Sequence, residues 1–445
     1  MNISSGKTVF GTDGIRGRLG SALFTQQQLC NLAHAISAWL KKRSAQSATR
    51  PRILILHDTR NSSGYIKSLF KMVFLSQTID IDDAGVLPTP AADFLIKKKG
   101  YDCALIISAS HNPWYDNGIK IIDRTGKLDA AAEKMIASHL DDLQQSVDYI
   151  NFGNEYMLHG TDEYRAIIAS FFQPNFLQGL KIVLDCAHGA TSAVAPALFQ
   201  NCGAQVITLH NQPNGFNIND ACGSLYPEKL RTAVLEQQAD FGFAFDGDGD
   251  RVLAVNRMGE LKNGDDFLAL LSTHPDYSKE RIIVGTTMTN VGLGAWLAQA
   301  GKKLVRTPVG DKYVAQGLEE YQAFLGGEQS GHIILKNHTH TGDGILVALK
   351  SIEAALLTNN TNFNTFVPFP QVLLTIPVKK MCNLSENPYL QLIEYAQQLI
   401  PSGRISVRYS GTEKNMLRIM VESDLLAQAH TIAQDLALLL QRELS

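Results

Sequence analysis

The sequence has few cysteines and no long apolar run. Six Cys are spread over 445 residues, without a C-x-x-C pair or a Cys/His spacing typical of zinc sites. This pattern excludes a disulfide framework and predicts reduced, structural thiols. No stretch reaches the roughly 18 apolar residues that cross a bilayer, and residues 1–20 lack the apolar segment of a signal peptide. We therefore expect a soluble, cytoplasmic protein that does not enter a membrane.

The chain also lacks an excess of either charge. Its 40 basic and 43 acidic residues give a net charge of -3, and they are mixed along the sequence. This argues against a nucleic-acid partner. The short basic cluster Lys97–Lys99 is interpreted as the solvated end of a helix. A hydrophobic content of 45% predicts a folded chain, and the length predicts roughly two to four domains.

Short β-rich runs that alternate with helical runs are abundant in the first three quarters of the chain. This alternation favours parallel strands with helices on both faces of each sheet. Three such modules follow one another. Their expected helices are residues 65–75, 192–201 and 291–300, and their expected strands are residues 52–56, 103–107, 181–185, 205–209, 241–245, 281–284, 303–306 and 323–325.

After about Pro368 the order of elements becomes that of an α+β module. We expect strands at 371–378, 405–409 and 416–421, a helix at 388–400 and a final helix. The polar stretch 357–370 is the linker candidate, and a hinge there would let the last module move. The predicted fold class is α/β: three similar α/β modules with mixed sheets, then a C-terminal α+β domain. The expected domain limits are 1–160, 161–257, 258–368 and 369–445.

Two motifs follow expected strands and carry reactive groups. Ser110 lies in a polar loop after strand 103–107, at the carboxyl end where open α/β sheets build their sites. A serine hydroxyl needs a base or a metal to become a nucleophile; the other interpretation of this loop is a plain turn. Asp246, Asp248 and Asp250 alternate with glycines after strand 241–245. Three converging carboxylates repel without a cation, so we predict a divalent metal site.

Two rivals for the aspartate motif make different predictions. A calcium EF-hand loop starting at Asp246 needs Gly and Glu where the chain has Arg251 and Arg257, so that interpretation fails. A phosphatase that forms an aspartyl phosphate on Asp246 remains open.

Three further loops are rich in groups that bind polar ligands. Gly326–His332 offers a carboxylate, an amide, a hydroxyl and an imidazole, which suits a sugar, and His332 could exchange protons near neutral pH. Arg408–Lys414 combines Arg, hydroxyls and Gly, as a phosphate nest would. Gly11–Gly17 holds one arginine but matches no nucleotide-binding motif. The alternative interpretation of Gly326–His332 is a polar β-turn with a surface histidine.

The joint order of these motifs resembles the α-D-phosphohexomutase superfamily over the whole chain. The segments that carry the resemblance are Gly11–Gly17, Ser108–Pro113, Asp116–Lys120, Phe245–Arg251, Gly326–His332 and Arg408–Lys414. The resemblance implies four domains around a central cleft. Lys414, Tyr409 and His57 depart from the superfamily's usual residues. These departures affect the expected mode and affinity of phosphate binding, not the reaction type.

The resemblance implies a role for each motif. Ser110 would be a phosphoserine, and with Asp246, Asp248 and Asp250 it would bind one Mg²⁺ per chain. Arg16, Lys120 and His332 would complete the catalytic centre. The expected substrate-binding residues are Arg251, Glu328, Ser330, Arg408, Ser410, Gly411 and Thr412.

The implied partner is a small hexosamine phosphate, with a sugar bisphosphate as activator. Gln329 favours the branch that acts on glucosamine phosphate, because the mannose and glucose branches usually carry Met there. That branch interconverts glucosamine 6-phosphate and glucosamine 1-phosphate for UDP-N-acetylglucosamine and cell-wall precursors. Phosphomannomutase or phosphoglucomutase activity is the alternative.

Overall fold

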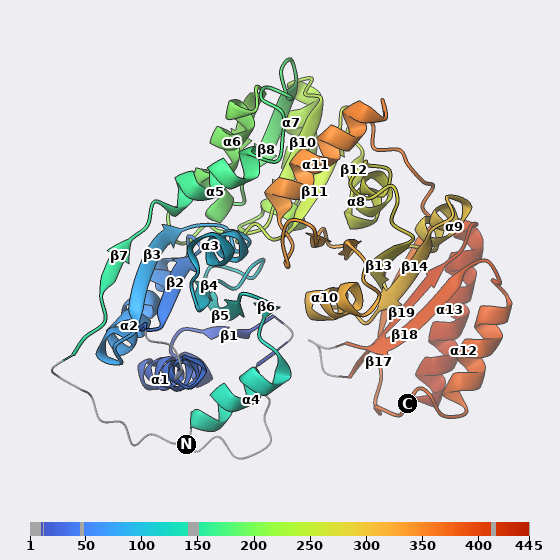
Figure 1. Cartoon of the computed structure of the whole chain (residues 1–445). Coiled ribbons are helices and arrows are strands. Elements are labelled where there is room, and N and C mark those ends of the chain that lie inside the picture. Colours follow the sequence, from blue (N-terminus) through green and yellow to red (C-terminus); the bar gives the residue numbers. More distant parts are fainter. Residues whose placement is uncertain (1–9, 12, 45–48, 141–150, 411–414, 445) are drawn as a thin grey trace. The chain divides into compact units, whose positions relative to one another are not determined.

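The computed structural model describes residues 10–11, 13–44, 49–140, 151–410 and 415–444. These residues form four β-sheets with helices packed on them (Figure 1). The chain divides into two compact units. The first comprises residues up to Met288 together with Val305–Thr365, and the second comprises Thr289–Leu304 and Phe366–Ser445.

The first sheet is mixed and has the strand order β1-β5-β4-β2-β3-β7, with β6 paired to β5. Strands β2, β3, β4 and β7 run parallel, whereas β5 is antiparallel to both β4 and β1. Helices α1, α2 and α4 share one apolar core with this sheet. The elements are β1 (Ile15–Arg18), α1 (Gln26–Arg43), β2 (Arg52–His57), α2 (Asn61–Ser76), β3 (Asp80–Val86), α3 (Ala91–Lys99), β4 (Cys103–Ile107), β5 (Asp116–Asp123), β6 (Gly126–Lys127), α4 (Ala130–His139) and β7 (Glu155–Met157).

The second sheet has the order β12-β11-β10-β8-β9, in which β9, β8 and β10 are parallel and β11 is antiparallel to β10. Strand β10 is fully buried because helices cover it. The elements are α5 (Gly160–Ala169), β8 (Lys181–Asp185), α6 (Ala195–Asn201), β9 (Gln205–Leu209), α7 (Glu228–Glu236), β10 (Phe241–Phe245), β11 (Val252–Asn256) and β12 (Leu261–Lys262).

The third sheet has the order β14-β13-β15-β16. Helix α11, which follows this sheet in sequence, packs against β10 and β11 of the second sheet. The elements are α8 (Gly264–Leu271), β13 (Ile282–Thr286), α9 (Val291–Gln299), β14 (Lys303–Thr307), α10 (Asp311–Glu320), β15 (Leu325–Gly327), β16 (Ile333–Leu335) and α11 (Gly344–Leu357).

The second unit contains an antiparallel sheet of order β17-β19-β18 with its own apolar core. Helices α12 and α13 pack together and supply part of that core. The elements are β17 (Gln371–Pro377), α12 (Tyr389–Gln398), β18 (Arg404–Tyr409), β19 (Met416–Glu422) and α13 (Leu426–Glu443). The predicted class, three α/β modules with mixed sheets and a C-terminal α+β module, is confirmed; the exact domain limits stay a prediction.

One predicted strand was misplaced at its start. The sequence predicted 323–325, but β15 begins at Leu325. Gln322 adopts a left-handed backbone with φ 50°, and Ala323 N–H donates to Leu318 O, so both residues still close the end of α10. This is the usual way in which a helix ends.

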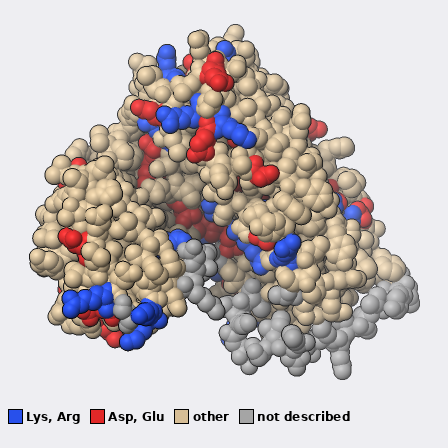
Figure 2. Space-filling view, turned by 180° about the vertical axis from the view of Figure 1, so that it is seen from behind, with Lys and Arg blue, Asp and Glu red and all other residues tan. Residues whose placement is uncertain are grey.

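Charge is distributed without a dominant sign. On the face shown in Figure 2, acidic and basic side chains occur in small groups of both signs. Among the described residues, no helix has the length and apolar character needed to cross a membrane.

Candidate active site

Ser110 lies in the loop just beyond the carboxyl end of β4, and it is buried, with 1% of its surface exposed. Its backbone is left-handed, with φ 52°, which is uncommon for a residue with a side chain and is often found at functional sites. Ser110 N–H donates to Ser108 Oγ at 2.9 Å. The hydroxyl of Ser110 donates to Asp246 Oδ2 at 2.6 Å. The structure thus brings together the first two motifs, which lie 136 residues apart.

A buried arginine that the sequence analysis did not single out holds this loop. Arg60 donates to the backbone carbonyls of Ser110, Asn112 and Asp116 at 2.8–2.9 Å, and also to that of Pro113. Asp58 pairs with Arg60 Nε at 2.8 Å, and both side chains are fully buried. Five donors in a rigid fork allow one guanidinium to fix several carbonyls at once. Its only sequence signal is its position after β2, at the same sheet edge as Ser110.

A second clamp comes from the loop before α7. Asn219 Nδ2 donates to Ser110 O at 2.8 Å and to Asn112 O at 3.0 Å. Gly247 approaches the same place, since a Cβ there would lie 2.7 Å from both Ser110 O and Asn219 Nδ2. A glycine is therefore required between the first two aspartates, because the two loops approach closely there. Asn219 was also missed, because nothing near it in sequence indicates this contact.

The three aspartates converge as the motif predicted. One carboxylate oxygen from each of Asp246, Asp248 and Asp250 lies within 4.8 Å of the others, and all three residues are buried. Asp248 Oδ1 and Asp250 Oδ1 are buried and accept no hydrogen bond from the described residues. Burial, Asp250 and Asp248 raise the pKa of Asp246 well above its usual range. Unsatisfied, all-oxygen ligands with this much negative charge fit a hard divalent cation.

Lys120 on β5 neutralises part of this charge. Its Nζ lies 2.9 Å from Asp248, 3.0 Å from Asp13 and 3.3 Å from Asp250. Burial alone would lower the pKa of Lys120, but the three carboxylates outweigh burial and raise it well above its usual range. Lys120 is therefore a fixed positive charge beside the triad. Thr89, another residue that the sequence analysis missed, donates its hydroxyl to Asp248 Oδ2 at 2.7 Å.

Four predicted site residues line one open cavity of about 330 Å³. They are Arg16, Arg251, Glu328 and Ser330. Arg16 donates to Asn112 Oδ1 at 3.2 Å and forms an ion pair with Asp13. Glu328 accepts from Gly310 N–H at 2.9 Å. The remaining lining residues are Asp13, His111, Asp250, Val309, Gly310 and Asp311.

Two histidines flank the triad in different ways. His332 is buried behind Asp250: its Nε2 accepts from Gly342 N–H at 3.1 Å, and its Nδ1 lies 3.7 Å from Asp250 Oδ1. His111 lines the cavity, and its Nδ1 lies 3.2 Å from Ser110 Oγ. Burial and the nearby Arg251 and Arg16 lower the pKa of His111 to about 4, so the ring is neutral near pH 7. His111 was part of the quoted motif but was not predicted as a site residue.

The predicted phosphate loop belongs to the second unit. Arg408 and Ser410 are at the end of β18, whereas Gly411 and Thr412 lie outside the described residues. Arg408 pairs directly with Arg418 of β19, so both side chains leave the same face of that sheet. Two opposed arginines on one face suit an anion. Tyr409 points the other way, and its hydroxyl donates to Cys382 O at 2.9 Å.

Comparison with known proteins agrees with this architecture. Residues 7–146, 162–259 and 263–367 match the models of α/β/α domains I, II and III of phosphoglucomutase/phosphomannomutase. The chain is 38% identical to the phosphoglucosamine mutase of Acinetobacter baumannii (strain AYE), over 96% of this chain and 97% of that protein. It is also 38% identical to the phosphoglucosamine mutase of Bdellovibrio bacteriovorus, over 98% and 99%.

A solved structure extends the comparison to the fold. A phosphoglucomutase/phosphomannomutase family protein from Burkholderia thailandensis superposes with a TM-score of 0.78 at 21% identity, covering 96% of each chain. The chain belongs to the phosphoglucomutase/phosphomannomutase family of phosphohexomutases. It is accordingly an enzyme of the isomerase class that transfers a phosphoryl group within a sugar phosphate.

Proposed function

We propose that the chain interconverts glucosamine 6-phosphate and glucosamine 1-phosphate through a phosphorylated Ser110 and a bisphosphate intermediate. Its product would feed UDP-N-acetylglucosamine and cell-wall precursors. The observation that carries the proposal is Ser110 Oγ at 2.6 Å from Asp246, one of three converging buried carboxylates beside a cavity lined by Arg and polar residues. The identity to phosphoglucosamine mutases along the whole chain supports the choice of sugar.

Magnesium fits the residues that would hold it. Asp246, Asp248 and Asp250 supply oxygen ligands, and a phosphate on Ser110 would supply another. When bound, the ion would neutralise charge on the transferring phosphoryl group. A phosphoserine adds about -1.5 to -2 at neutral pH, so three aspartates and one lysine leave the site too negative without a cation.

The chain's own residues would align the reactants and move protons. Arg60 and Asn219 fix the Ser110 backbone, and Lys120 and Arg16 present fixed positive charge. The phosphoryl group would leave Ser110 Oγ for one sugar hydroxyl, and the proton lost by that hydroxyl would pass through a nearby base to the Ser110 oxygen. After the bisphosphate has turned, its other phosphoryl group would return to Ser110. Neutral His111, 3.2 Å from Ser110 Oγ, is placed to carry the serine's proton in both directions.

Mass spectrometry distinguishes this mechanism from the phosphatase alternative. Peptide mapping of the purified protein, incubated with a trace of sugar bisphosphate, should find phosphate on Ser110. Ser110→Ala should abolish turnover, while Ser138→Ala, a change at an exposed serine of α4, should have no effect. An acid-labile label on Asp246 would support the phosphatase instead. Binding of substrate with full function in Ser110→Ala would indicate a non-catalytic sensor.

A rate comparison tests the sugar. The 6-phosphates of glucosamine, glucose and mannose should be assayed side by side with a trace of bisphosphate activator. We expect the highest kcat/KM for the glucosamine compound. Equal rates for the three sugars would defeat the assignment.

Arg408 is proposed to bind the distal phosphate in both orientations of the bisphosphate. Removing one charge-assisted contact should raise KM by about tenfold or more. Arg408→Ala should be compared with Arg442→Ala, a change on α13 in the same unit. If Arg408→Ala left both KM and kcat unchanged, the proposed role would be wrong.

A further inference from the structure

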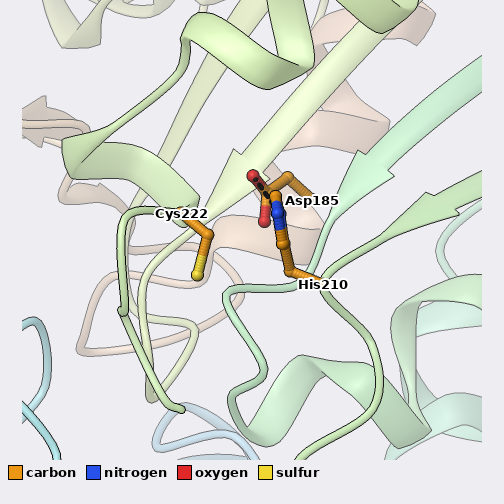
Figure 3. A group of neighbouring side chains, drawn as sticks. All are labelled: Asp185, His210 and Cys222. Atoms are coloured by element: carbon orange, nitrogen blue, oxygen red, sulfur yellow. Dashed lines mark ion pairs between the residues drawn. The ribbon is translucent and has the colours of Figure 1, made fainter.

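A second cluster of possible metal ligands lies within the second sheet. Asp185 ends β8, His210 follows the neighbouring parallel strand β9, and Cys222 is in the loop that precedes α7. Figure 3 shows the carboxylate and the imidazole turned toward each other, with the thiol beside them. One ligand atom from each residue lies within 4.8 Å of the others. The sequence spacing gave no hint of such a site, because the three residues are brought together only by the parallel strands.

Backbone N–H groups hold the carboxylate of Asp185 in place. Asp185 Oδ1 accepts from Ala187 N–H and Oδ2 accepts from Gly223 N–H, each at 3.0 Å. Asp185 is fully buried and Cys222 is 1% exposed. Such support for a carboxylate by backbone donors is typical of ligands in metal sites.

The imidazole of His210 supplies the observation that points to a ligand. Its Nδ1 lies 3.0 Å from Asp185 Oδ2, but this contact is not a hydrogen bond, and the buried Nδ1 has no hydrogen-bond partner among the described residues. Asp185 and His210 form an ion pair when the imidazole is protonated (Figure 3), and a metal ion between the two atoms would stabilise the same close approach. Unsatisfied buried polar atoms call for a partner that the protein side chains do not provide.

The chemistry of the set selects the class of metal. A thiolate, an imidazole and a carboxylate suit zinc and similar divalent transition metals, whereas magnesium and calcium prefer oxygen alone. We propose that Asp185, His210 and Cys222 bind one Zn²⁺ per chain, with a solvent molecule as a further ligand, at a site separate from the aspartate triad.

The location gives this site a structural role. The loop that carries Cys222 also carries Asn219, whose N–H donates to Ala187 O at 2.9 Å and whose side chain holds the Ser110 carbonyl. A metal bound to Cys222, Asp185 and His210 would tie this loop to the ends of β8 and β9. It would do so without touching the reacting atoms.

Cobalt is the probe that separates this site from the triad. The full-length protein, with the triad saturated by Mg²⁺, is titrated with Co²⁺ under reducing conditions. We expect a near-ultraviolet thiolate-to-cobalt charge-transfer band that saturates at one equivalent and is removed by Zn²⁺. The oxygen-only triad cannot give such a band, so Asp248→Asn should keep it.

Matched variants identify the ligands. Cys222→Ser should lose the band, whereas Cys202→Ser, a change at another buried cysteine of the same sheet region, should keep it. His210→Asn keeps the thiol and should weaken Zn²⁺ binding by about 10–100-fold, measured by competition with a chromogenic chelator. Circular dichroism of each metal-free variant checks that it is folded. Absence of the band in the wild-type protein, or its survival in Cys222→Ser, would overturn the proposal.

Discussion

At the scale of single residues, the candidate active site depends on close approach of two backbones. The loop of Ser110 and the loop of the aspartates come from different sheets, and they meet where Gly247 has no side chain. Arg60 and Asn219 then fix the carbonyls of the Ser110 loop. The reactive hydroxyl is thus positioned mainly by contacts to backbone, so small displacements of either loop should matter.

Substituting Gly247 by Ala should separate the two loops. The new Cβ would meet Ser110 O and Asn219 Nδ2 at 2.7 Å, so something must shift. We expect a loss of stability of about 1–3 kcal/mol and a fall in kcat of roughly 100-fold, because a displacement near 1 Å is that costly in an aligned site. Thermal melting and steady-state kinetics measure the two effects.

The matched control is Gly64→Ala. Gly64 is in the interior of α2, and an added Cβ would meet no atom within 4 Å. Ala is the better helix former by up to about 1 kcal/mol, so this variant should be as stable as the wild type or more so, with unchanged kcat. Equal kinetics for both variants would show that the approach at Gly247 is not needed for catalysis.

At the scale of elements, α11 begins with a buried cap. Asp343 accepts from Leu346 N–H at 3.0 Å and from the hydroxyl of Tyr164 on α5 at 2.7 Å. Burial raises the pKa of Asp343 to about 6. The folded state therefore keeps a proton on this carboxyl at pH values where the unfolded chain has already released it.

This shift predicts a pH-dependent contribution to stability with a definite sign. Because the folded pKa is the higher one, the free energy of unfolding falls as pH rises from about 4 to about 6 and then levels off. The change is on the order of 3 kcal/mol. In Asp343→Asn this contribution disappears. The melting temperature of the variant, relative to that of the wild type, should therefore rise between pH 4 and pH 7.

The variant for comparison is Asp129→Asn at the exposed N-cap of α4, where the side chain accepts from Ala132 N–H; its melting temperature is measured over the same pH range. A difference in melting temperature between Asp343→Asn and the wild type that stays constant from pH 4 to pH 7 would contradict the assigned role of Asp343.

At the scale of the whole molecule, the chain has two compact units with separate cores. Leu105 is in the core of the first sheet and Leu436 is in the core shared by α12, α13 and their sheet. Residues that share one apolar core unfold together, so we expect two calorimetric transitions rather than one. A destabilising substitution in one core should lower the transition midpoint of that unit alone.

Truncation of each leucine tests this division. Leu105→Ala and Leu436→Ala should each cost about 2–5 kcal/mol, and each should lower the midpoint of a different transition in scanning calorimetry. A single transition that both variants lower equally would show that the two units unfold together.

Some strands could be predicted from the sequence and others could not. The expected strands 103–107, 181–185, 205–209 and 241–245 coincide with β4, β8, β9 and β10. β4, β8 and β10 are buried almost throughout, and buried strands of a parallel sheet are continuous apolar runs, whereas β9 is a partly exposed edge strand. β3 and β5 were not predicted as strands. Their residues include several aspartates that are stabilised by ion pairs from elsewhere, such as Arg52 to Asp82 at 2.6 Å. Such pairing is not visible in local sequence.

By itself, the sequence determined the chemistry available to this protein: a serine and three carboxylates at the carboxyl ends of strands, and a series of motifs that defines the family. These are local properties, since they depend on residue type and on spacing along a strand and its loop. Only the tertiary structure decided which distant groups serve them. Asn219 and Arg60 hold the Ser110 carbonyl where Gly247 lets two loops approach, and Cys222 joins Asp185 and His210, because strand order and the packing of the first two sheets bring separate loops together.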